Sequence, residues 1–244
     1  MIFNLSNVNS ALVIGANKGI GLAIAKRLKE DHGIKNVYAT YRNEKTANEL
    51  LANHALEALR FDPSKEEEYI KLSKDIESAD LIINCIGTLH HENLSPEKSL
   101  RDINFESLEE YFKVNSFITP MIAKHFKGHL RKSSNPLLCA ISAKVGSIED
   151  NQMGGWYGYR SSKAALNMFL KTIDIEFKRD KIDCVVRAVH PGTTETELSK
   201  PFIKNTKYKL HEPSGTAKNI LEVLDGSDSE DHLFISWDKE EIKW

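Results

Sequence analysis

Three glycines in a seven-residue turn, Gly15, Gly19 and Gly21, directly follow the first apolar run of the chain, residues 11–14. Residues 22–28 then carry apolar side chains at helical spacing. Glycines allow the backbone between strand and helix to turn sharply and to approach a ligand. The helix N-terminus presents free N–H groups and a positive dipole end to a pyrophosphate. A tight turn without a ligand is the alternative, and three glycines in one turn favour dinucleotide binding.

A second pair of residues, Tyr159 and Lys163, stands four positions apart where a helical pattern begins. Residues at this spacing lie one turn apart on the same helix face, so the phenol and the ammonium can share a pocket. A nearby cation favours the phenolate and lowers the phenol pKa from its usual value of about 10. Tyr159 is therefore a candidate general acid–base. An ordinary half-buried ring beside a solvated charge is the alternative.

The spacing Gly15-x-x-x-Gly19-x-Gly21, together with Tyr159-x-x-x-Lys163, resembles the short-chain dehydrogenase/reductase family. The resemblance spans nearly the whole chain. It implies one Rossmann-type, doubly wound α/β domain over residues 1–244, with a mainly parallel seven-stranded sheet and helices on both faces. A chain of 244 residues that is 41% hydrophobic is long enough for the core of such a domain.

The apolar patterning divides the chain into alternating strands and helices. Pro120 is expected to bend its helix locally, and residues 94–106 are expected to form a loop. Strands are predicted at 11–14, 36–41, 56–61, 80–87, 135–142, 182–190 and in the tail 233–244, and helices at 22–28, 44–54, 65–77, 107–127, 159–178 and 214–224.

The cofactor preference is predicted from the end of the second strand. An acidic residue there would accept from a ribose 2′-hydroxyl, whereas a basic residue would accommodate a 2′-phosphate. Tyr41 occupies the usual position of the acid, Arg42 follows it, and Lys18 adds a cation in the glycine turn. These cations suit a phosphate, so we predict NADP(H) in preference to NAD(H). Two solvated surface charges are the alternative.

Further landmarks of the family recur at matching positions. The resemblance implies that Asp62 contacts the adenine, although a turn acid before Pro63 is the alternative. It also implies that Pro191-Gly192 and the threonines after it lie against the nicotinamide. The implied cofactor contacts are Gly15, Asn17, Lys18, Gly19, Ile20, Gly21, Arg42, Asp62, Asn84, Gly87, Tyr159, Lys163, Pro191, Gly192, Thr194 and Thr196.

The family's catalytic serine, which hydrogen-bonds the substrate carbonyl, usually stands three residues before Gly146, where this chain has Ala143. We predict that Ser142, one residue earlier, takes that role. A one-residue slip along a strand reverses side-chain direction, so Ser147 and Tyr157 are alternatives. The resemblance further implies that an asparagine in helix 107–127 anchors a water in a proton relay. The predicted catalytic residues are Asn115, Ser142, Tyr159 and Lys163.

The resemblance implies an NADP(H)-dependent reductase of a small ketone, aldehyde or quinone, and a homo-oligomer, dimer or tetramer. Residues 146–148 and 154–159 are similar to the C-factor and sniffer-type carbonyl reductase branch. A signalling or cofactor-sensing role with little turnover is the alternative, and Ala143 supports it. A substrate lid is expected at about 198–213, with an apolar lining of Phe202, Ile203, Tyr208 and Leu210.

Charge and cysteine usage exclude other functions. A net charge of −2 offers no electrostatic footprint for nucleic acid or an anionic membrane. No apolar run of about 18 residues predicts a membrane span, and residues 1–9 lack a secretory signal. Three cysteines without metal-ligand spacing predict buried thiols in a reducing compartment and no metal site. We therefore expect a cytoplasmic protein.

Overall fold

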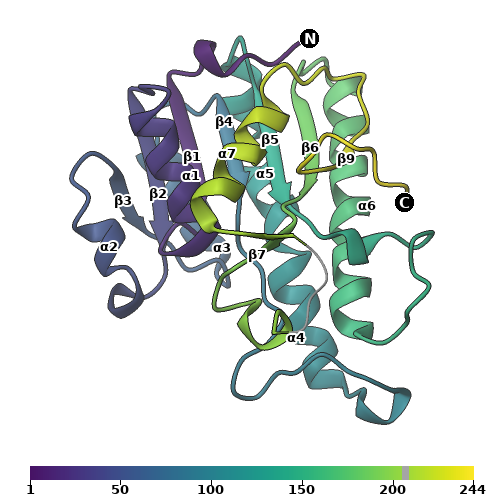
Figure 1. Cartoon of the computed structure of the whole chain (residues 1–244). Coiled ribbons are helices and arrows are strands. Elements are labelled where there is room, and N and C mark those ends of the chain that lie inside the picture. The colour runs from purple at the N-terminus through teal and green to yellow at the C-terminus, as the bar shows by residue number, and fades with distance from the viewer. Residues whose placement is uncertain (205–208) are drawn as a thin grey trace.

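A seven-stranded sheet runs through the centre of the molecule in the order β3-β2-β1-β4-β5-β6-β9, and all its neighbours are parallel (Figure 1). The computed structural model describes residues 1–204 and 209–244. The predicted doubly wound α/β fold is confirmed. The strands are β1 (Ser10–Ile14), β2 (Asn36–Tyr41), β3 (Glu57–Arg60), β4 (Leu81–Asn84), β5 (Leu137–Ile141), β6 (Val185–His190) and β9 (Phe234–Ser236).

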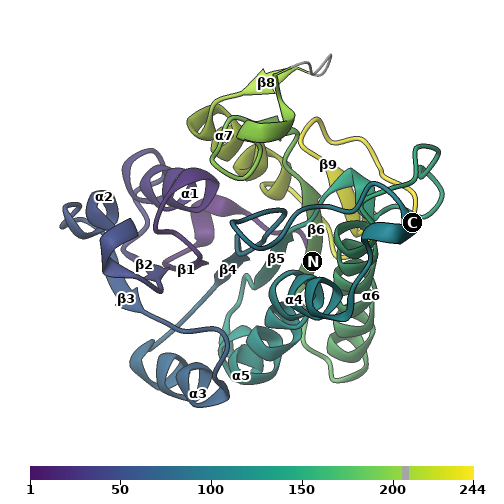
Figure 2. The same cartoon turned by 90° about the horizontal axis from the view of Figure 1, so that it is seen from below.

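Helices cover both faces of the sheet (Figure 2). One face packs against α1 (Gly19–Glu30) and α7 (Pro213–Leu224), and the other against α3 (Glu66–Asp75), α5 (Ile118–Lys132) and α6 (Tyr157–Arg179). Alternate residues of β1 enter the two cores: Val13 packs on the α1 side and Leu12 on the opposite side. All five residues of β1 are buried, as expected of a parallel strand covered on both faces.

The strand order places a crevice beside β1. From β1 the chain winds outward through β2 and β3, then returns to β4 on the other side of β1, and Ile14 aligns with Asn84 there. In open α/β sheets ligands bind at such a switch point, beyond the carboxyl ends of the strands. The fold therefore points to the segments that follow β1 and β4.

Two predicted helices are wrong in detail. The expected helix 107–127 is two helices, α4 (Phe105–Asn115) and α5, separated at Ser116, whose hydroxyl donates to the Ser162 carbonyl over 2.8 Å. Pro120 does not bend a continuous helix but lies in the first turn of α5, where a missing N–H costs no helical bond. The expected helix 44–54 is a 3₁₀ turn, Glu44–Thr46, followed by the short α2 (Asn48–Leu51).

A small two-stranded sheet was not predicted. β7 (Thr193–Thr194) pairs in parallel with β8 (Leu210–His211), and a 3₁₀ turn, Lys200–Phe202, lies between them. The pairing joins residues just before the predicted lid segment to residues near its C-terminal end. Two-residue strands leave almost no periodicity in a sequence.

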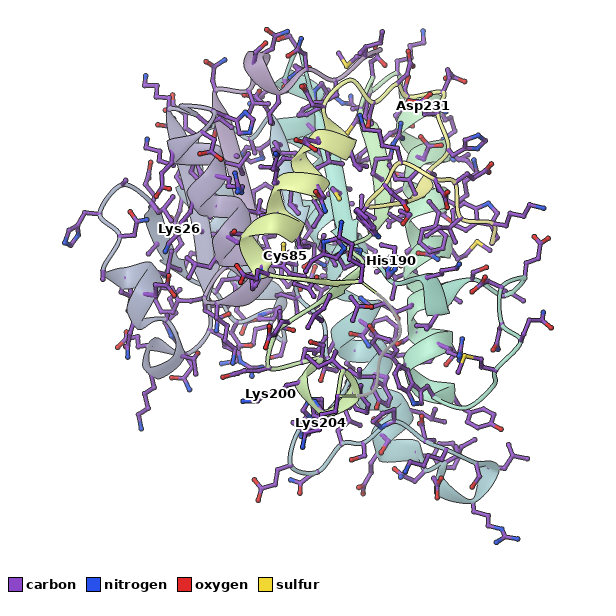
Figure 3. The ribbon with its side chains drawn as sticks, in the orientation of Figure 1. Lys26, Cys85, His190, Lys200, Lys204 and Asp231 are labelled. Carbon is purple, nitrogen blue, oxygen red and sulfur yellow. The ribbon has the colours of Figure 1, made fainter. Side chains whose placement is uncertain are left out.

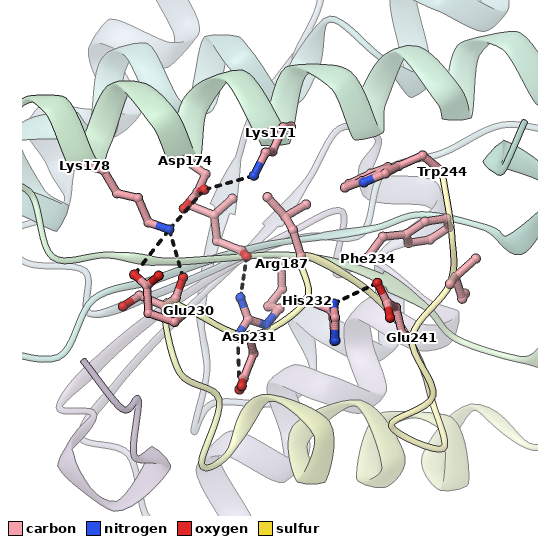
Figure 4. Close-up of a pocket in the computed structure, with 14 residues that line it drawn as sticks. Lys171, Asp174, Lys178, Arg187, Glu230, Asp231, His232, Phe234, Glu241 and Trp244 are labelled. Atoms are coloured by element: carbon pink, nitrogen blue, oxygen red, sulfur yellow. Dashed lines mark hydrogen bonds and ion pairs between the residues drawn. The ribbon is translucent and has the colours of Figure 1, made fainter.

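The C-terminal segment returns along β9 and encloses a cavity of about 270 Å³ against α6 (Figure 4). Charged side chains line it: Lys178 lies 3.5 Å from Asp174, and Arg187 lies 3.6 Å from Asp231. None of the predicted site residues lines this cavity. In the described part of the chain, no helix has the length and apolar character needed to cross a bilayer.

Candidate active site

The glycine turn is packed so closely at Gly15 and Gly21 that side chains would not fit there. Gly15 has φ +81°, and a Cβ there would lie 2.7 Å from Cγ1 of Ile86. A Cβ on Gly21 would lie 2.3 Å from the Gly15 carbonyl oxygen. The first turn of α1 receives no side-chain cap from Lys18, so its backbone N–H groups are left for an outside acceptor. Free N–H groups at a helix N-terminus fit a pyrophosphate.

Both predicted phosphate-binding cations lie near this turn. Lys18 immediately precedes α1 and forms an ion pair with Glu197, just before the predicted lid segment. Arg42 is exposed just after β2 and forms no ion pair within residues 1–204 and 209–244. Asn17 donates to the Thr46 hydroxyl over 3.2 Å, which ties the glycine turn to the segment after β2. The cations thus lie beside the free helix terminus.

Asp62 has the hydrogen bonds of a turn acid. Its Oδ1 accepts from the Ser64 N–H over 3.1 Å and from the Ser64 hydroxyl over 2.7 Å. These bonds, the hydroxyl first, hold the pKa of Asp62 below its usual value. The same carboxylate follows β3 and remains partly exposed. Its proposed contact with adenine stays a prediction.

Tyr159 and Lys163 lie in the first two turns of α6, and both are buried. Lys163 is 3% exposed, and its Nζ donates to the Ile141 carbonyl at the end of β5 over 2.8 Å. The Tyr159 ring packs edge-on against Tyr111, with centroids 6.3 Å apart. The helix thus places the phenol and the ammonium at the carboxyl edge of the sheet, one turn apart.

The predicted lowering of the Tyr159 pKa is not seen in this structure. Burial raises the pKa of Tyr159 to about 12. Burial also lowers the pKa of Lys163 to about 8, because the ammonium loses solvation. One N–H of the ammonium donates to the Ile141 carbonyl. Desolvation of the phenol is the main cause of the raised Tyr159 pKa. The tyrosine is therefore a protonated donor throughout the neutral range.

Asn115 and Gly87 meet Lys163 from the opposite side. A Cβ on Gly87 would lie 3.4 Å from Asn115 Oδ1 and 3.5 Å from Lys163 Nζ. Asn115, the last residue of α4, accepts from the Thr88 N–H over 2.8 Å and donates to the Ser162 hydroxyl over 3.0 Å. Its amide therefore fixes the loop after β4 against α6. The loop after β4 thus runs in van der Waals range of the ammonium at Gly87.

Asn84, the last residue of β4, stabilises the loop after that strand. Its amide nitrogen donates to the Thr119 hydroxyl over 2.9 Å, and its Oδ1 accepts from the Ile86 N–H over 3.0 Å. The side chain is buried. Asn84 therefore shapes the turn before Gly87 rather than offering free polar atoms.

Ser142 forms a buried hydrogen bond with a residue farther along α6 than Tyr159 and Lys163. Its hydroxyl is buried and donates to Asn167 Oδ1 over 2.7 Å. The next residue, Ala143, is the one that packs against the cluster containing Tyr159 and Tyr111. Side chains alternate along an extended chain, so neighbouring positions after β5 make different contacts. The predicted role of Ser142 in orienting the substrate carbonyl stays a prediction, and its hydroxyl is already bonded to Asn167.

Ser147 and Tyr157 were the alternative donors to the substrate carbonyl. Ser147 is buried at the end of a 3₁₀ turn, Lys144–Gly146, and its Oγ accepts from the Asp150 N–H over 3.1 Å. Tyr157 is the first residue of α6 and is 36% exposed. Neither hydroxyl occupies the place that Ala143 has beside Tyr159.

The segment after β6 reaches from the sheet edge over the glycine turn. Thr194 is buried, and its hydroxyl lies 2.8 Å from that of Thr216. A Cβ on Gly19 would lie 3.6 Å from Cγ2 of Thr196. Gly192 has φ +75° and packs against Trp237. Residues 191–196 and the N-terminus of α1 therefore face one another.

Trp156, which was not among the predicted site residues, connects this segment to Tyr159 through Phe202. Trp156 packs edge-on against Tyr159 and Phe202, with centroids 6.1 and 5.3 Å apart. Phe202 also contacts His90, with centroids 5.5 Å apart. Of the predicted lid residues, Phe202 is thus at the site and Leu210 is exposed, whereas Tyr208 lies outside the described residues. The run Gly154-Gly155-Trp156 before Tyr159 was the available signal.

Two further titratable groups lie at this edge (Figure 3). Burial raises the pKa of the Cys85 thiol to about 12. Burial lowers the pKa of His190 to about 4, and its Nδ1 has no hydrogen-bond partner in the described chain. Cys139 and Cys184 are buried and free. Within the described residues, no group of three or more His, Cys, Asp or Glu could hold a metal ion.

Comparison with protein families gives one extended match. A family model described as short chain dehydrogenase matches residues 9–207. Among curated proteins, benzil reductase ((S)-benzoin forming) of Bacillus subtilis is 23% identical over 208 residues, 82% of this chain and 80% of that protein. C-signal of Myxococcus xanthus is 25% identical over 147 residues, 60% of this chain and 84% of that protein.

Solved structures share the fold over almost the full length. The carbonyl reductase Sniffer of D. melanogaster superimposes with a TM-score of 0.85 at 24% identity, covering 97% of this chain and 100% of that one. NADPH-bound carbonyl reductase from chicken fatty liver superimposes with a TM-score of 0.87 at 23% identity, covering 98% and 95%. At these identities the likeness concerns the fold.

Proposed function

The chain belongs to the short-chain dehydrogenase family, and on that premise we propose that it is an NADPH-dependent reductase of small carbonyl compounds. Tyr159 delivers the proton to the carbonyl oxygen. The substrate class is a ketone, aldehyde or quinone. The reductases of benzil and of other carbonyls among the similar proteins support this class.

One observation carries the proposal. The ammonium of Lys163 is held at the sheet edge by Ile141, beside the space left by the missing side chain of Gly87, and Tyr159 lies one turn earlier on the same helix. A buried cation and a buried phenol at the carboxyl edge of the sheet form an acid–base pair, and no carboxylate in residues 1–204 or 209–244 pairs with that cation. A purely structural lysine would instead be paired or solvated.

The residues present fit a dinucleotide. Gly15 and Gly21 leave no room for side chains, and the N-terminus of α1 receives no side-chain cap. Backbone N–H groups of Gly19, Ile20 and Gly21 would hold the pyrophosphate, and the segment with Thr194 and Thr196 would close over it. When bound, the cofactor supplies the hydride.

Proton transfer then follows from the order of the pKa values. With a pKa of about 12, Tyr159 is protonated at neutral pH and can donate to an oxygen on which negative charge develops. The pKa of Lys163 is about 8, so its ammonium can return a proton to the tyrosinate. We propose that a water held near Asn115 reconnects Lys163 with solvent. Both groups thus hold protons that can be delivered during reduction.

We propose NADPH as the preferred cofactor because of Lys18 and Arg42. Both cations lie beside the glycine turn, and no acid ends β2. Arg42 has free donors for a 2′-phosphate, and Lys18 must leave Glu197 to join it. Asp62 would face the adenine.

The test is a titration with NADPH and with NADH, followed by NADPH oxidation in the presence of ketones, aldehydes, quinones and aromatic 1,2-diketones. We expect tighter binding of NADPH and turnover of at least one carbonyl class. Weak binding of both cofactors would contradict the proposal, and tight binding without turnover across the panel would favour the second candidate.

That second candidate is a signalling or cofactor-sensing protein with little turnover. It is favoured by Ala143, which brings a methyl group rather than a hydroxyl to the pocket of Tyr159, and by the likeness to C-signal. Without a second donor to the carbonyl oxygen, transition-state stabilisation is weaker. A Tyr159→Phe variant that retained a signalling phenotype would establish this role.

We also propose that the whole chain acts as one domain in a homo-oligomer, with residues 198–213 as the substrate lid. Apolar side chains of Phe117, Met168 and Ile175 are exposed beside and along the outer face of α6. Burial of this surface against another copy would stabilise a dimer or tetramer. Light scattering of the purified protein tests the assembly.

A further inference from the structure

Glu97 is a buried carboxylate without a cation. It lies in the loop before α4 and is 2% exposed. Within the described residues, no lysine, arginine or histidine pairs with it; both its oxygens accept from the Gly158 N–H, over 3.1 and 3.3 Å. Burial of a carboxylate is costly unless hydrogen bonds or dipoles stabilise it. The site that it serves is therefore the start of α6.

Helix α6 has no cap of its own. Trp156, at the N-cap position, is left-handed with φ 51°, and its indole offers no acceptor. Glu97 contributes twice: its backbone carbonyl accepts from the Trp156 N–H over 2.5 Å, and its carboxylate accepts from Gly158. A negative charge at this position also interacts favourably with the helix dipole. The cap thus comes from a residue 61 positions earlier in the chain.

The close approach of Glu97 depends on Gly158. A Cβ there would lie 2.8 Å from Oε1 of Glu97 and 2.3 Å from the ring of Tyr111. Tyr111 in turn packs edge-on against Tyr159. The carboxylate, the glycine and the two rings are therefore in one continuous contact, and Tyr159 is the next residue after the amide that Glu97 holds.

We propose that Glu97 is a positioning residue that fixes the first turn of α6 and, through it, the direction of the Tyr159 hydroxyl. This inference rests on the proposed role of Tyr159 as proton donor. The part played by Glu97 is to accept the hydrogen bond from Gly158. The loop that contains it thereby belongs to the active-site framework.

The test compares Glu97→Ala, Glu97→Gln and Glu97→Asp with the wild type. Glutamine keeps an acceptor at the same distance, whereas aspartate keeps the charge and draws the acceptor back by one methylene. We expect Glu97→Ala to lower kcat about tenfold or more, because small displacements of a catalytic group are costly. The kcat of Glu97→Asp should lie between those of Glu97→Ala and wild type, and the kcat of Glu97→Gln should stay within about threefold of wild type. The Kd for NADPH should not change.

A second measurement is independent of turnover. Hydrogen–deuterium exchange in the peptide covering residues 156–163 should be at least about fivefold faster in Glu97→Ala than in wild type, with α1 unaffected. Glu110→Ala is the matched control, since Glu110 is a nearby carboxylate on α4 that pairs with His91 and does not cap α6. It should leave both measurements unchanged.

The outcomes separate the two proposals. If wild type turns over no carbonyl, the proposed function fails, and the exchange measurement still decides the role of Glu97. Unchanged kcat and exchange in Glu97→Ala overturn the inference, as does a loss in Glu97→Gln equal to that in Glu97→Ala. A loss of NADPH affinity in Glu97→Ala as large as its loss of kcat would also overturn the inference, since it would indicate that the whole fold is perturbed. Glu97→Asp carries the test if the alanine variant does not fold.

Discussion

The Lys163 ammonium donates a hydrogen bond to the backbone carbonyl of Ile141 over 2.8 Å, which holds α6 against the end of β5. The ammonium is thereby held at the sheet edge with two donors remaining. A carbonyl stabilises the charge less than a carboxylate would, and burial dominates the pKa of Lys163. The charge of this group is consequently sensitive to mildly alkaline pH.

The first prediction concerns that sensitivity. Burial lowers the pKa of Lys163 to about 8, so the ammonium is present below pH 8 and is lost as the pH rises through it. If the charged form is needed, kcat/KM for carbonyl reduction should be level between about pH 6 and 7 and fall about tenfold per unit well above pH 8. Lys163→Arg stays charged, so its residual activity should lack this decline. The same decline in both proteins would contradict the assignment.

Removal of the phenol hydroxyl should separate chemistry from binding. Tyr159→Phe keeps the ring that packs on Tyr111 and Trp156 but removes the proton donor. We expect kcat to fall about 10²- to 10⁴-fold, the usual range for a general acid, with NADPH affinity within about threefold of wild type. Stopped-flow and fluorescence titration measure the two quantities. Retained turnover would show that another group protonates the carbonyl.

The position of the missing hydroxyl predicts opposite results at neighbouring residues. Ala143→Ser places a hydroxyl on the side of Tyr159 and should raise kcat several-fold, because a second donor then reaches the carbonyl oxygen. Ser142→Ala should leave kcat almost unchanged and lower the free energy of unfolding by about 1–3 kcal/mol, since Asn167 loses its buried partner. A large loss of kcat in Ser142→Ala would show that Ser142 belongs to the catalytic set.

The fold could be predicted because its determinants are local. The glycine turn after residues 11–14 and the apolar runs at 80–87 and 182–190 have the periodicity of parallel strands and their crossovers. Those strands lie where expected, and the family assignment is confirmed. The apolar patterning gave the approximate bounds of the strands, whereas the doubly wound arrangement followed from the resemblance to the family.

The finer site could not be predicted because it depends on side-chain direction and on distant contacts. The sequence Ile141-Ser142-Ala143 does not show which side chain lies beside Tyr159 once β5 has ended. The break between α4 and α5 depends on the Ser162 carbonyl, and the cap of α6 depends on Glu97. Such partners come together only in the folded chain, so a periodic pattern does not contain them.

The ion pair between Lys18 and Glu197 predicts how cofactor binding responds to charge. A 2′-phosphate must compete with the Glu197 carboxylate for Lys18. Glu197→Gln should therefore tighten NADPH binding a few-fold at low salt, a modest gain because the pair is exposed. Lys18→Met and Arg42→Gln should each weaken NADPH binding about tenfold and spare NADH. Equal effects on both cofactors would exclude these cations as phosphate ligands.

His190 predicts acid sensitivity of the folded state. Burial lowers its pKa to about 4 from an ordinary value of 6.5, with a smaller lowering from Lys144. Between these values the unfolded chain binds a proton that the folded protein does not, so the free energy of unfolding falls as the pH falls through that window. The full difference corresponds to about 3 kcal/mol.

A substitution isolates this contribution from the carboxylates that titrate in the same range. Between pH 7 and pH 5, the free energy of unfolding measured in urea should fall by about 2 kcal/mol less in His190→Gln than in wild type. His32→Gln, at an exposed histidine, should behave as wild type. Parallel losses in His190→Gln and wild type would mean that the imidazole is protonated within the fold. In that case Nδ1, which lacks a hydrogen-bond partner in this structure, would form a hydrogen bond in solution. His190 would then be a charged residue beside the site rather than a neutral one.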